Sequence, residues 1–234
     1  MEWSESFKPS CSLKDSVYDA LKTQIILGRL QAGEQLNIAE LAKNMGISSA
    51  PVREALSMLH QNGFVVLNPR KKATVSNVLT NDYNILMDLR QLLEPYAAKL
   101  SAKNIPDNEL QGMRKKLEAV LKNPDDMYAY VDSDLSLHDM IFQYCGSVIL
   151  ADILRIIKEH SLRIRYCVEE MAEESKKSEF VVETTTEHLK ILDALELGDS
   201  DGVYEAMGMH IKNFLLRSKR GGIIEQFLSN RHAE

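Results

Sequence analysis

Four side chains in the second half of the sequence have types and spacing that suit a metal ion. Asp134 and His138 lie four residues apart, so on a helix they share one face about a turn from each other. His188 and His210 each fall in helical register with apolar neighbours and are expected to point into a helical bundle. Burying a carboxylate and three imidazoles is costly without partners. A divalent cation would satisfy all four and keep coordination positions open for water or a ligand.

The same spacing also fits a simpler interpretation, in which each histidine is a hydrogen-bonded core residue. A single histidine on an apolar helix face is more often of that kind, and we assign no metal to His160, which falls beside Ile156 and Ile157. If the site binds metal, zinc, nickel and manganese are all compatible with its nitrogen and oxygen ligands. The spacing does not choose between them.

A second group of residues, in the first third of the sequence, suits DNA binding. The pattern predicts two helices joined by a turn at Met45–Ile47, the second of them capped by Ser48 or Ser49. With Ala50, these serines form a helix N-terminus whose N–H groups can meet phosphate. Arg53, one turn further on, is able to contact guanine O6 and N7 through two hydrogen bonds in the major groove. The alternative is that Arg53 is only a solvated surface charge.

The elements around this pair predict a winged helix-turn-helix. Apolar residues repeat at helical spacing from Leu13 to a stop at Gly28, ahead of the two helices. After them, Phe64–Leu67 and Ala73–Val75 are short runs rich in β-branched residues on either side of a polar tip, which predicts a hairpin. The tip carries three basic residues that suit a wing along the DNA backbone or, more simply, aid solubility: Arg70, Lys71 and Lys72.

Only helical periods follow the expected domain junction at residues 77–82. The predicted helices cover residues 83–100, 107–121, 127–145, 149–171, 180–197 and 200–217, with a short tail helix at 223–228. No strand pattern interrupts them, which favours an antiparallel helical bundle. The predicted fold is therefore mainly α, with a winged helix-turn-helix domain over residues 11–77 and an all-helical domain over residues 82–229.

Charge is unevenly distributed along the sequence. The net charge is −6, but residues 11–77 hold eight basic and five acidic side chains, a balance of +3, whereas residues 78–234 carry −8. A basic head on an acidic body is expected when only one domain meets phosphate. The three cysteines are far apart with no CxxC pair, and there is no signal-peptide or membrane-spanning apolar run. We therefore expect a cytoplasmic protein with no membrane partner.

The stretch SAPVREAL at Ser49–Leu56, followed by Leu59 and Gly63, resembles the recognition-helix signature of the GntR family of bacterial regulators. The resemblance covers nearly the whole chain and extends to the FadR-like subgroup, which has a helical ligand domain called FCD. Two positions depart from the family pattern. Ser49 stands where an arginine is usual, and the wing tip Pro69–Lys72 lacks the common glycine. We still expect the chain to bind DNA, but we do not expect it to recognise the operator sequence that is usual in the family.

The resemblance also implies roles for residues of the helical domain. The positions of the FCD metal ligands are all filled, by Asp134, His138, His188 and His210. Such domains bind small organic or sugar acids, whose carboxylate completes the metal coordination while an arginine often holds the other end. Arg90 is the first candidate for that arginine, followed by Arg163 and Arg165. A purely structural pair of Arg90 with Glu94, four residues on, is an equal alternative.

Together these features imply a homodimeric, DNA-binding transcription regulator whose helical domain binds an effector and holds the dimer. Two winged heads would engage the half-sites of a roughly palindromic operator, and a small carboxylate effector would shift the equilibrium between two states. Repression relieved by the effector is the commoner arrangement in the family. The alternatives are a metal sensor and, less well supported, a metal-dependent hydrolase or lyase. Against an enzyme, the sequence contains no HExxH, nucleophile elbow, P-loop or GxGxxG motif.

Overall fold

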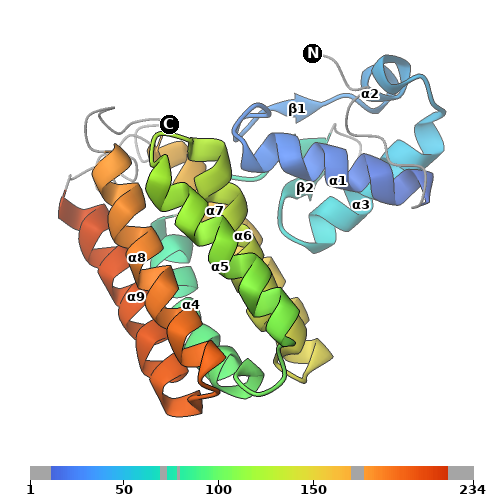
Figure 1. Ribbon diagram of the computed structural model, residues 1–234. Helices are drawn as coiled ribbons and strands as arrows, with labels where there is room; N and C mark the ends of the chain where they lie inside the picture. Colours follow the sequence, from blue (N-terminus) through green and yellow to red (C-terminus); the bar gives the residue numbers. More distant parts are fainter. Residues whose placement is uncertain (1–11, 69–72, 78–79, 170–176, 221–234) are drawn as a thin grey trace. The chain divides into compact units, whose positions relative to one another are not determined.

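The computed structural model describes residues 12–68, 73–77, 80–169 and 177–220. The chain divides into two compact units after Leu79, and the segment Leu162–Cys167 groups with the first unit. Figure 1 shows the helices and strands of both units. None of the described helices combines the length and apolar composition that a membrane span requires.

The first unit confirms the predicted winged helix-turn-helix. Its elements are α1 (Leu13–Ile26), β1 (Gln35–Leu36), α2 (Ile38–Met45), α3 (Ser49–Gln61), β2 (Val65–Leu67) and β3 (Ala73–Val75). The strands form an antiparallel sheet in the order β1-β3-β2, in which Thr74 of the central strand is paired with Gln35 on one side and Val66 on the other. Strand β1 was not predicted, because two residues are too few to show an alternating pattern.

Side chains at the helix ends explain the turn between α2 and α3. The Asn37 side-chain oxygen caps α2 by accepting hydrogen bonds from the backbone N–H of Ala39 at 3.1 Å and of Glu40 at 3.5 Å. Gly46 ends α2 in the left-handed conformation, with φ 66°, which glycine adopts without a Cβ clash. Ser48 is the N-cap of α3, but its side chain makes no capping hydrogen bond.

A shared apolar core holds α3 in place within the first unit. Val17 and Leu21 of α1, Val52 and Leu56 of α3, and Phe64 before the hairpin are all at most 1 % exposed and belong to one hydrophobic cluster. Because the buried residues of α3 follow helical spacing, its opposite face is left to the solvent. The fold therefore presents one face of α3 outward on a fixed support.

The second unit confirms the predicted helical bundle. Its helices are α4 (Thr80–Ser101), α5 (Asp107–Lys122), α6 (Met127–Tyr144), α7 (Val148–Glu169, whose end groups with the first unit), α8 (Lys177–Glu196) and α9 (Ser200–Arg220). Helix α4 packs against α6 and α9, and α8 packs against α5, α6 and α9. Both α4 and α8 begin three residues before their predicted starts. The predicted tail helix at 223–228 lies outside the described residues.

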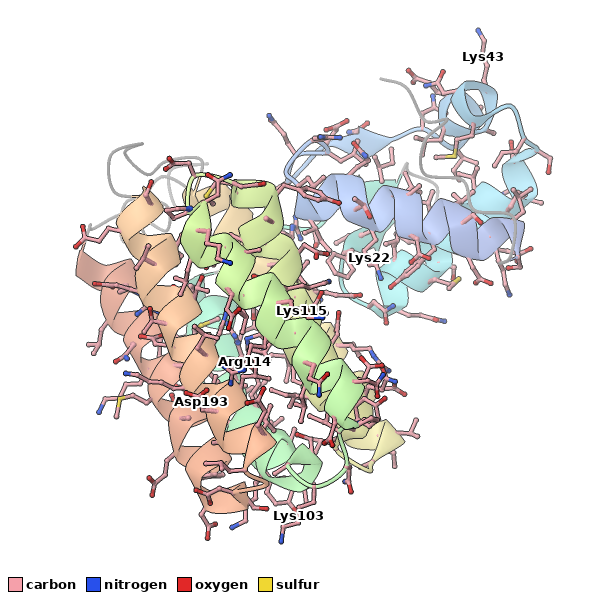
Figure 2. The ribbon with its side chains drawn as sticks, viewed as in Figure 1. Lys22, Lys43, Lys103, Arg114, Lys115 and Asp193 are labelled. Carbon is pink, nitrogen blue, oxygen red and sulfur yellow. The ribbon has the colours of Figure 1, made fainter. Side chains whose placement is uncertain are left out.

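An ion-pair cluster on the bundle surface joins α5 to α8, the helix that carries His188. Arg114 of α5 donates to Asp193 at 2.6 Å and to both carboxylate oxygens of Glu196 at 2.7 and 2.8 Å. Figure 2 shows Arg114 and Asp193 close together on this surface. Exposed ion pairs contribute little energy on their own, but the fork of Arg114 favours one register of α5 against α8.

Replacing Gly46 tests how far the stability of the first unit depends on the turn between α2 and α3. Gly46→Ala should destabilise the first unit by about 1–2 kcal/mol, because an alanine at positive φ is strained even where space is open. Gly112→Ala is the control, since Gly112 lies inside α5 with ordinary φ and open space and the change should be neutral or stabilising. Chemical denaturation of both variants measures the difference, and equal stabilities would contradict this account of the turn.

Candidate functional site

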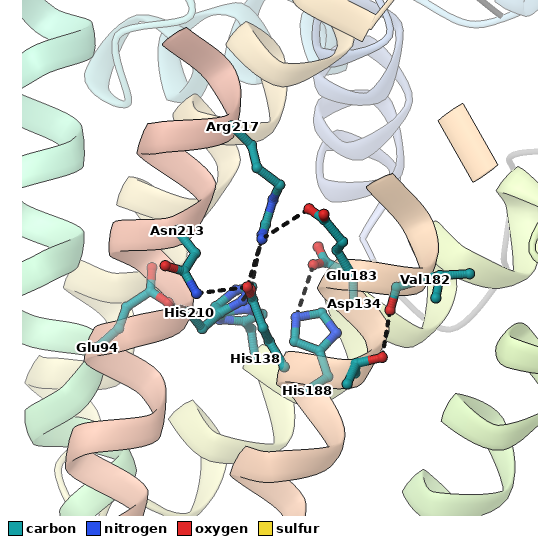
Figure 3. Close-up of polar contacts among 12 residues, drawn as sticks. Glu94, Asp134, His138, Val182, Glu183, His188, His210, Asn213 and Arg217 are labelled. Carbon is teal, nitrogen blue, oxygen red and sulfur yellow. Dashed lines mark hydrogen bonds and ion pairs between the residues drawn. The ribbon is translucent and has the colours of Figure 1, made fainter. Parts of the chain in front are cut away.

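Three helices of the bundle bring the four predicted metal ligands together. Asp134 and His138 come from α6, His188 from α8 and His210 from α9, and all four are buried, with at most 6 % exposed. Each offers a nitrogen or oxygen atom, and these atoms all lie within 4.8 Å of one another. Figure 3 shows the side chains converging between the helices. We call these four residues the ligand cluster.

The imidazole rings of the ligand cluster lie against each other. The ring centroids of His188 and His210 are 4.6 Å apart, and that of His138 is 5.8 Å from His188 and 5.6 Å from His210. Asp134 Oδ1 lies 3.5 Å from His188 Nε2. His138 Nε2 is buried and has no hydrogen-bond partner among the described residues. A buried nitrogen of this kind, beside other lone-pair donors, fits a metal ion, because coordination replaces the lost hydrogen bond.

Glu94 of α4 contacts His138. The sequence suggests Glu94 only as a partner for Arg90. Its Oε2 atom is 2.8 Å from His138 Nδ1, and its Oε1 atom accepts a hydrogen bond of 2.5 Å from Arg90 Nε. Burial raises the pKa of the Glu94 carboxyl. The nearby Arg90 guanidinium and His138 lower it by a larger amount, so the pKa lies below its ordinary value. An ionised Glu94 favours a proton on His138 Nδ1, which leaves Nε2 as the metal-binding atom.

Glu187 of α8 supports His210 in the same way. Its Oε2 atom lies 3.0 Å from His210 Nδ1, while Arg217 donates to both carboxylate oxygens at 2.6 and 2.9 Å and Asn213 donates to Oε1 at 2.8 Å. Burial raises the pKa of Glu187, but its hydrogen bonds with Arg217, His210 and Asn213 lower it to about 2. Figure 3 shows Asn213 and Arg217 on the helix of His210. His210 is therefore oriented by an ionised carboxylate, with Nε2 left over for a metal.

Burial keeps His210 neutral, which is the form that binds metal. Removing the imidazole from water lowers its pKa below the ordinary value, although the hydrogen bond with Glu187 acts in the opposite direction. A neutral imidazole with a proton on Nδ1 has a lone pair on Nε2. The arrangement can therefore hold a divalent cation through the imidazoles of His138, His188 and His210 and the Asp134 carboxylate, as nitrogen and oxygen ligands suited to zinc, nickel or manganese.

The three predicted effector-binding arginines lie in different settings. Arg90 is adjacent to the ligand cluster through Glu94, and its guanidinium carbon lies 5.8 Å from the centre of the Phe214 ring. Arg163 groups with the first unit, where it donates to Ser76 Oγ at 3.0 Å and to the Ser76 carbonyl at 2.5 Å. The side chain of Arg165 lies outside the described part of the structure. The structure shows the pair of Arg90 with Glu94 beside the cluster, and the effector-binding role of Arg90 stays a prediction.

The candidate DNA-reading surface is the start of α3. Ser48, Ala50 and Arg53 are exposed and Ser49 is half-buried, so the predicted face does point outward. No acidic residue lies in the first turn of α3, and no side chain caps it. The free N–H groups and the positive end of the helix dipole therefore suit a phosphate. The predicted wing residues Arg70, Lys71 and Lys72 lie outside the described residues.

Sequence reasoning missed the two supporting carboxylates for an identifiable reason. Glu187 directly precedes His188, and helical geometry turns it about 100° away from that residue. It instead meets a histidine of the neighbouring helix α9. Glu94 meets a histidine of α6. Both contacts depend on which helix faces pack together, and no spacing within one helix reveals that.

The supporting carboxylates give a test of the metal centre. We expect chelator-stripped protein to bind one zinc ion per chain, and His188→Gln to lose that binding. Glu187→Gln should lower zinc affinity about 10- to 100-fold, because the amide no longer holds His210 as a charged acceptor. Glu196→Gln, on the same helix but paired with Arg114 at the surface, is the matched control. Competition against a chromophoric chelator measures all four proteins. Equal zinc affinities for the wild type and Glu187→Gln would refute the supporting role.

Comparison with known proteins agrees with this division of the chain. The model of the bacterial regulatory proteins of the gntR family matches residues 13–75, and the FCD domain model matches residues 85–213. The repressor RspR of Escherichia coli is 22% identical over 206 residues, which cover 87% of this chain and 88% of RspR. The HTH-type regulator YdhC of Bacillus subtilis is 26% identical over 152 residues, covering 63% of this chain and 68% of YdhC.

A solved structure has the same fold. The structure of McbR from E. coli superimposes with a TM-score of 0.74 over 90% of this chain and 99% of that chain, at 22% sequence identity. The matched families and relatives are transcription regulators and not enzymes, so the hydrolase or lyase alternative has no support. With the FCD model alone covering more than half of the sequence, the chain belongs to the GntR family of transcription regulators and carries an FCD domain behind its winged helix-turn-helix.

Proposed function

We propose that this regulator binds a DNA operator as a homodimer and that a small organic or sugar acid controls its affinity through the ligand cluster. The observation that carries the proposal is the buried set of three imidazoles and one carboxylate, inside a bundle that follows an exposed helix-turn-helix. We infer that the chain is a repressor acting in the cytoplasm, where its operator would lie.

The proposed contact with DNA uses the exposed start of α3. Arg53 would read a guanine edge, because its guanidinium can donate two parallel hydrogen bonds. Ser48, Ser49 and Ala50 would stand at the sugar-phosphate backbone around the helix N-terminus. The twofold symmetry of a homodimer would be matched by two half-sites about one helical turn apart or a multiple of that.

The proposed effector site uses the ligand cluster and Arg90. When bound, a divalent cation would supply positive charge and open coordination positions for a carboxylate oxygen. Asp134, His138, His188 and His210 would hold it, while Glu94 and Glu187 keep His138 and His210 oriented. Arg90 would hold the other end of the acid, and Arg163 and Arg165 are the remaining candidates. The affinity difference of the acid for the two states of the bundle would supply the switch.

A metal sensor is the second candidate function. Four protein donors within 4.8 Å of one another can fill a tetrahedral zinc shell without any added ligand. In that case the cation itself would be the signal. The two candidates differ in one observable, because only an acid-responsive regulator changes its DNA affinity with the acid while the metal concentration is constant.

Two substitutions separate base reading from general attraction to DNA. Arg53→Ala should abolish the preference for an operator fragment selected from random duplexes, because each lost bidentate contact is worth about 1–3 kcal/mol of discrimination. Lys71→Ala should weaken binding to operator and random duplex alike, since a phosphate contact carries no sequence information. Titration of both duplexes at fixed salt measures the ratio. If Arg53→Ala weakened both duplexes equally, Arg53 would have no base-reading role.

Thermal stability tests the effector proposal directly. We expect one acid from a panel of small carboxylic and sugar acids to raise the melting temperature of zinc-loaded protein but not of chelator-stripped protein, because a ligand stabilises the state that binds it. The same acid should change operator affinity at constant zinc. A fall in stability on chelation with no response to any acid would favour the metal sensor. No effect of chelation or acids would mean that the histidines are only core residues.

A further inference from the structure

A short segment near the end of α7 belongs to the first unit, which carries the helix-turn-helix. Helix α7 is continuous from Val148 to Glu169, yet the segment Leu162–Cys167 groups with the first unit. Arg163 lies in this segment and is only 3 % exposed, although arginine is rarely buried. A guanidinium that leaves water needs hydrogen-bond acceptors within the protein, so its place in the fold is specific.

Ser76 supplies two of these acceptors. Arg163 donates from Nη1 to Ser76 Oγ at 3.0 Å and from Nη2 to the Ser76 carbonyl at 2.5 Å. Because the N–H groups of a guanidinium form a rigid planar fork, two hydrogen bonds to one residue fix both its position and its orientation. Ser76 directly follows Val75, the last residue of β3. Arg163 therefore holds the point at which the chain leaves the sheet.

Ser76 is in turn bonded to the chain that ends α3. Its hydroxyl donates to the Gly63 carbonyl at 2.6 Å, and its backbone N–H donates to the Phe64 carbonyl at 2.9 Å. The Phe64 N–H donates at 2.9 Å to the carbonyl of Leu59, which lies in the last turn of α3. Phe64 is also fully buried in the apolar cluster that holds α3. A series of hydrogen bonds thus leads from Arg163 through Ser76 to the recognition helix.

The earlier part of α7 is attached to the helical bundle. Leu154 is fully buried in the core cluster of the bundle. Lys158 donates to Asp139 of α6, the residue that follows His138 of the ligand cluster. Lys158 and Arg163 are five residues apart, so on one helix they are separated by about 7.5 Å along its axis. Because a helix is stiff over so short a length, a displacement of α7 at α6 would also displace Arg163.

We propose that Arg163 is a positioning residue for DNA recognition and that α7 connects the ligand cluster to α3 through it. Arg163 holds Ser76, and Ser76 holds the end of α3, the helix whose first turn would meet the DNA. A shift of α7 therefore changes the direction of α3 and the affinity for the operator. This inference rests on the proposed function, since operator binding is the activity that is controlled. It leaves effector binding to Arg90 and Arg165.

The first experiment measures how selectively the full-length protein binds DNA. Arg163→Gln should lower affinity for the selected operator fragment about tenfold, because α3 is no longer held in the direction that reads the bases. Affinity for random duplex should change by less than about twofold, since attraction to phosphates depends on charge and not on that direction. Arg155→Gln is the matched control. Arg155 lies exposed on the same helix and pairs with Asp152 at 2.6 Å, so loss of its charge should change neither affinity.

A second variant tests whether Arg163 acts through Ser76. Ser76→Ala removes the hydroxyl between Arg163 and Gly63 but keeps the carbonyl, so it should lower operator affinity by a smaller factor, about threefold. Residues that act along one series of contacts have effects that do not add. The double variant should therefore bind the operator about as weakly as Arg163→Gln alone. Losses that multiply would show that the two residues act separately and would overturn the proposed series of bonds.

The outcomes separate a positioning role from a merely stabilising one, with the melting temperature as the measure of stability. If Arg163→Gln lost stability but kept the ratio of operator to random affinity, Arg163 would only stabilise the first unit and the inference would be wrong. Unchanged stability and binding in Arg163→Gln would overturn it as well. If the wild type preferred no fragment selected from random duplexes, the proposed function itself would fail.

The connection to the ligand cluster has a readout of its own. Removal of zinc from the wild type with a chelator should change operator affinity about threefold or more, and Arg155→Gln should keep this response. In Arg163→Gln, the zinc-loaded and stripped proteins should agree within about twofold. A zinc response of equal size in Arg163→Gln and the wild type would overturn the connection through Arg163. If zinc did not change the operator affinity of the wild type, the connection from the ligand cluster to α3 would be wrong.

Discussion

Burial of three imidazoles and a carboxylate at one point between helices is the constraint on which the second unit depends. Such groups lose their hydration on folding, and each must find another partner. The bundle provides these partners for two of the histidines. Glu94 lies at Nδ1 of His138 and is paired with Arg90. Glu187 lies at Nδ1 of His210 and is paired with Arg217. The polar groups of α4, α6, α8 and α9 therefore help to specify how these helices pack, together with their apolar faces.

The first unit differs from the second in where its polar groups lie. Its polar groups of interest are on the surface, and the buried side chains of α2 and α3 are all apolar. What must be maintained there is the direction of α3, which depends on the left-handed Gly46 and on Val52 and Leu56 in the core. The uneven charge along the chain reflects this division, since residues 11–77 carry +3 and residues 78–234 carry −8.

Features that depend on one helix at a time were predictable from the sequence. Apolar periodicity located the helices, and the spacing of Asp134 and His138 identified a shared face. The register of His188 and His210 indicated which way they point, and the family resemblance joined them into one site. The pairing of Glu94 with His138 and of Glu187 with His210 could not be predicted, because it depends on the rotation of one helix against another. Strand β1 could not be predicted for another reason, since its two residues form a strand only because β3 lies beside them.

The ligands of the cluster come from parts of the chain that are far apart in sequence. Asp134 and His138 lie on α6, His188 on α8 and His210 on α9, so a bound cation would close two successive loops, one that includes α7 and one between α8 and α9. A cross-link of that span restricts the unfolded chain far more than the folded one, as a disulfide does. Loss of the cation would then release both loops at once, and the lifetime of the bundle against proteolysis would follow the supply of metal.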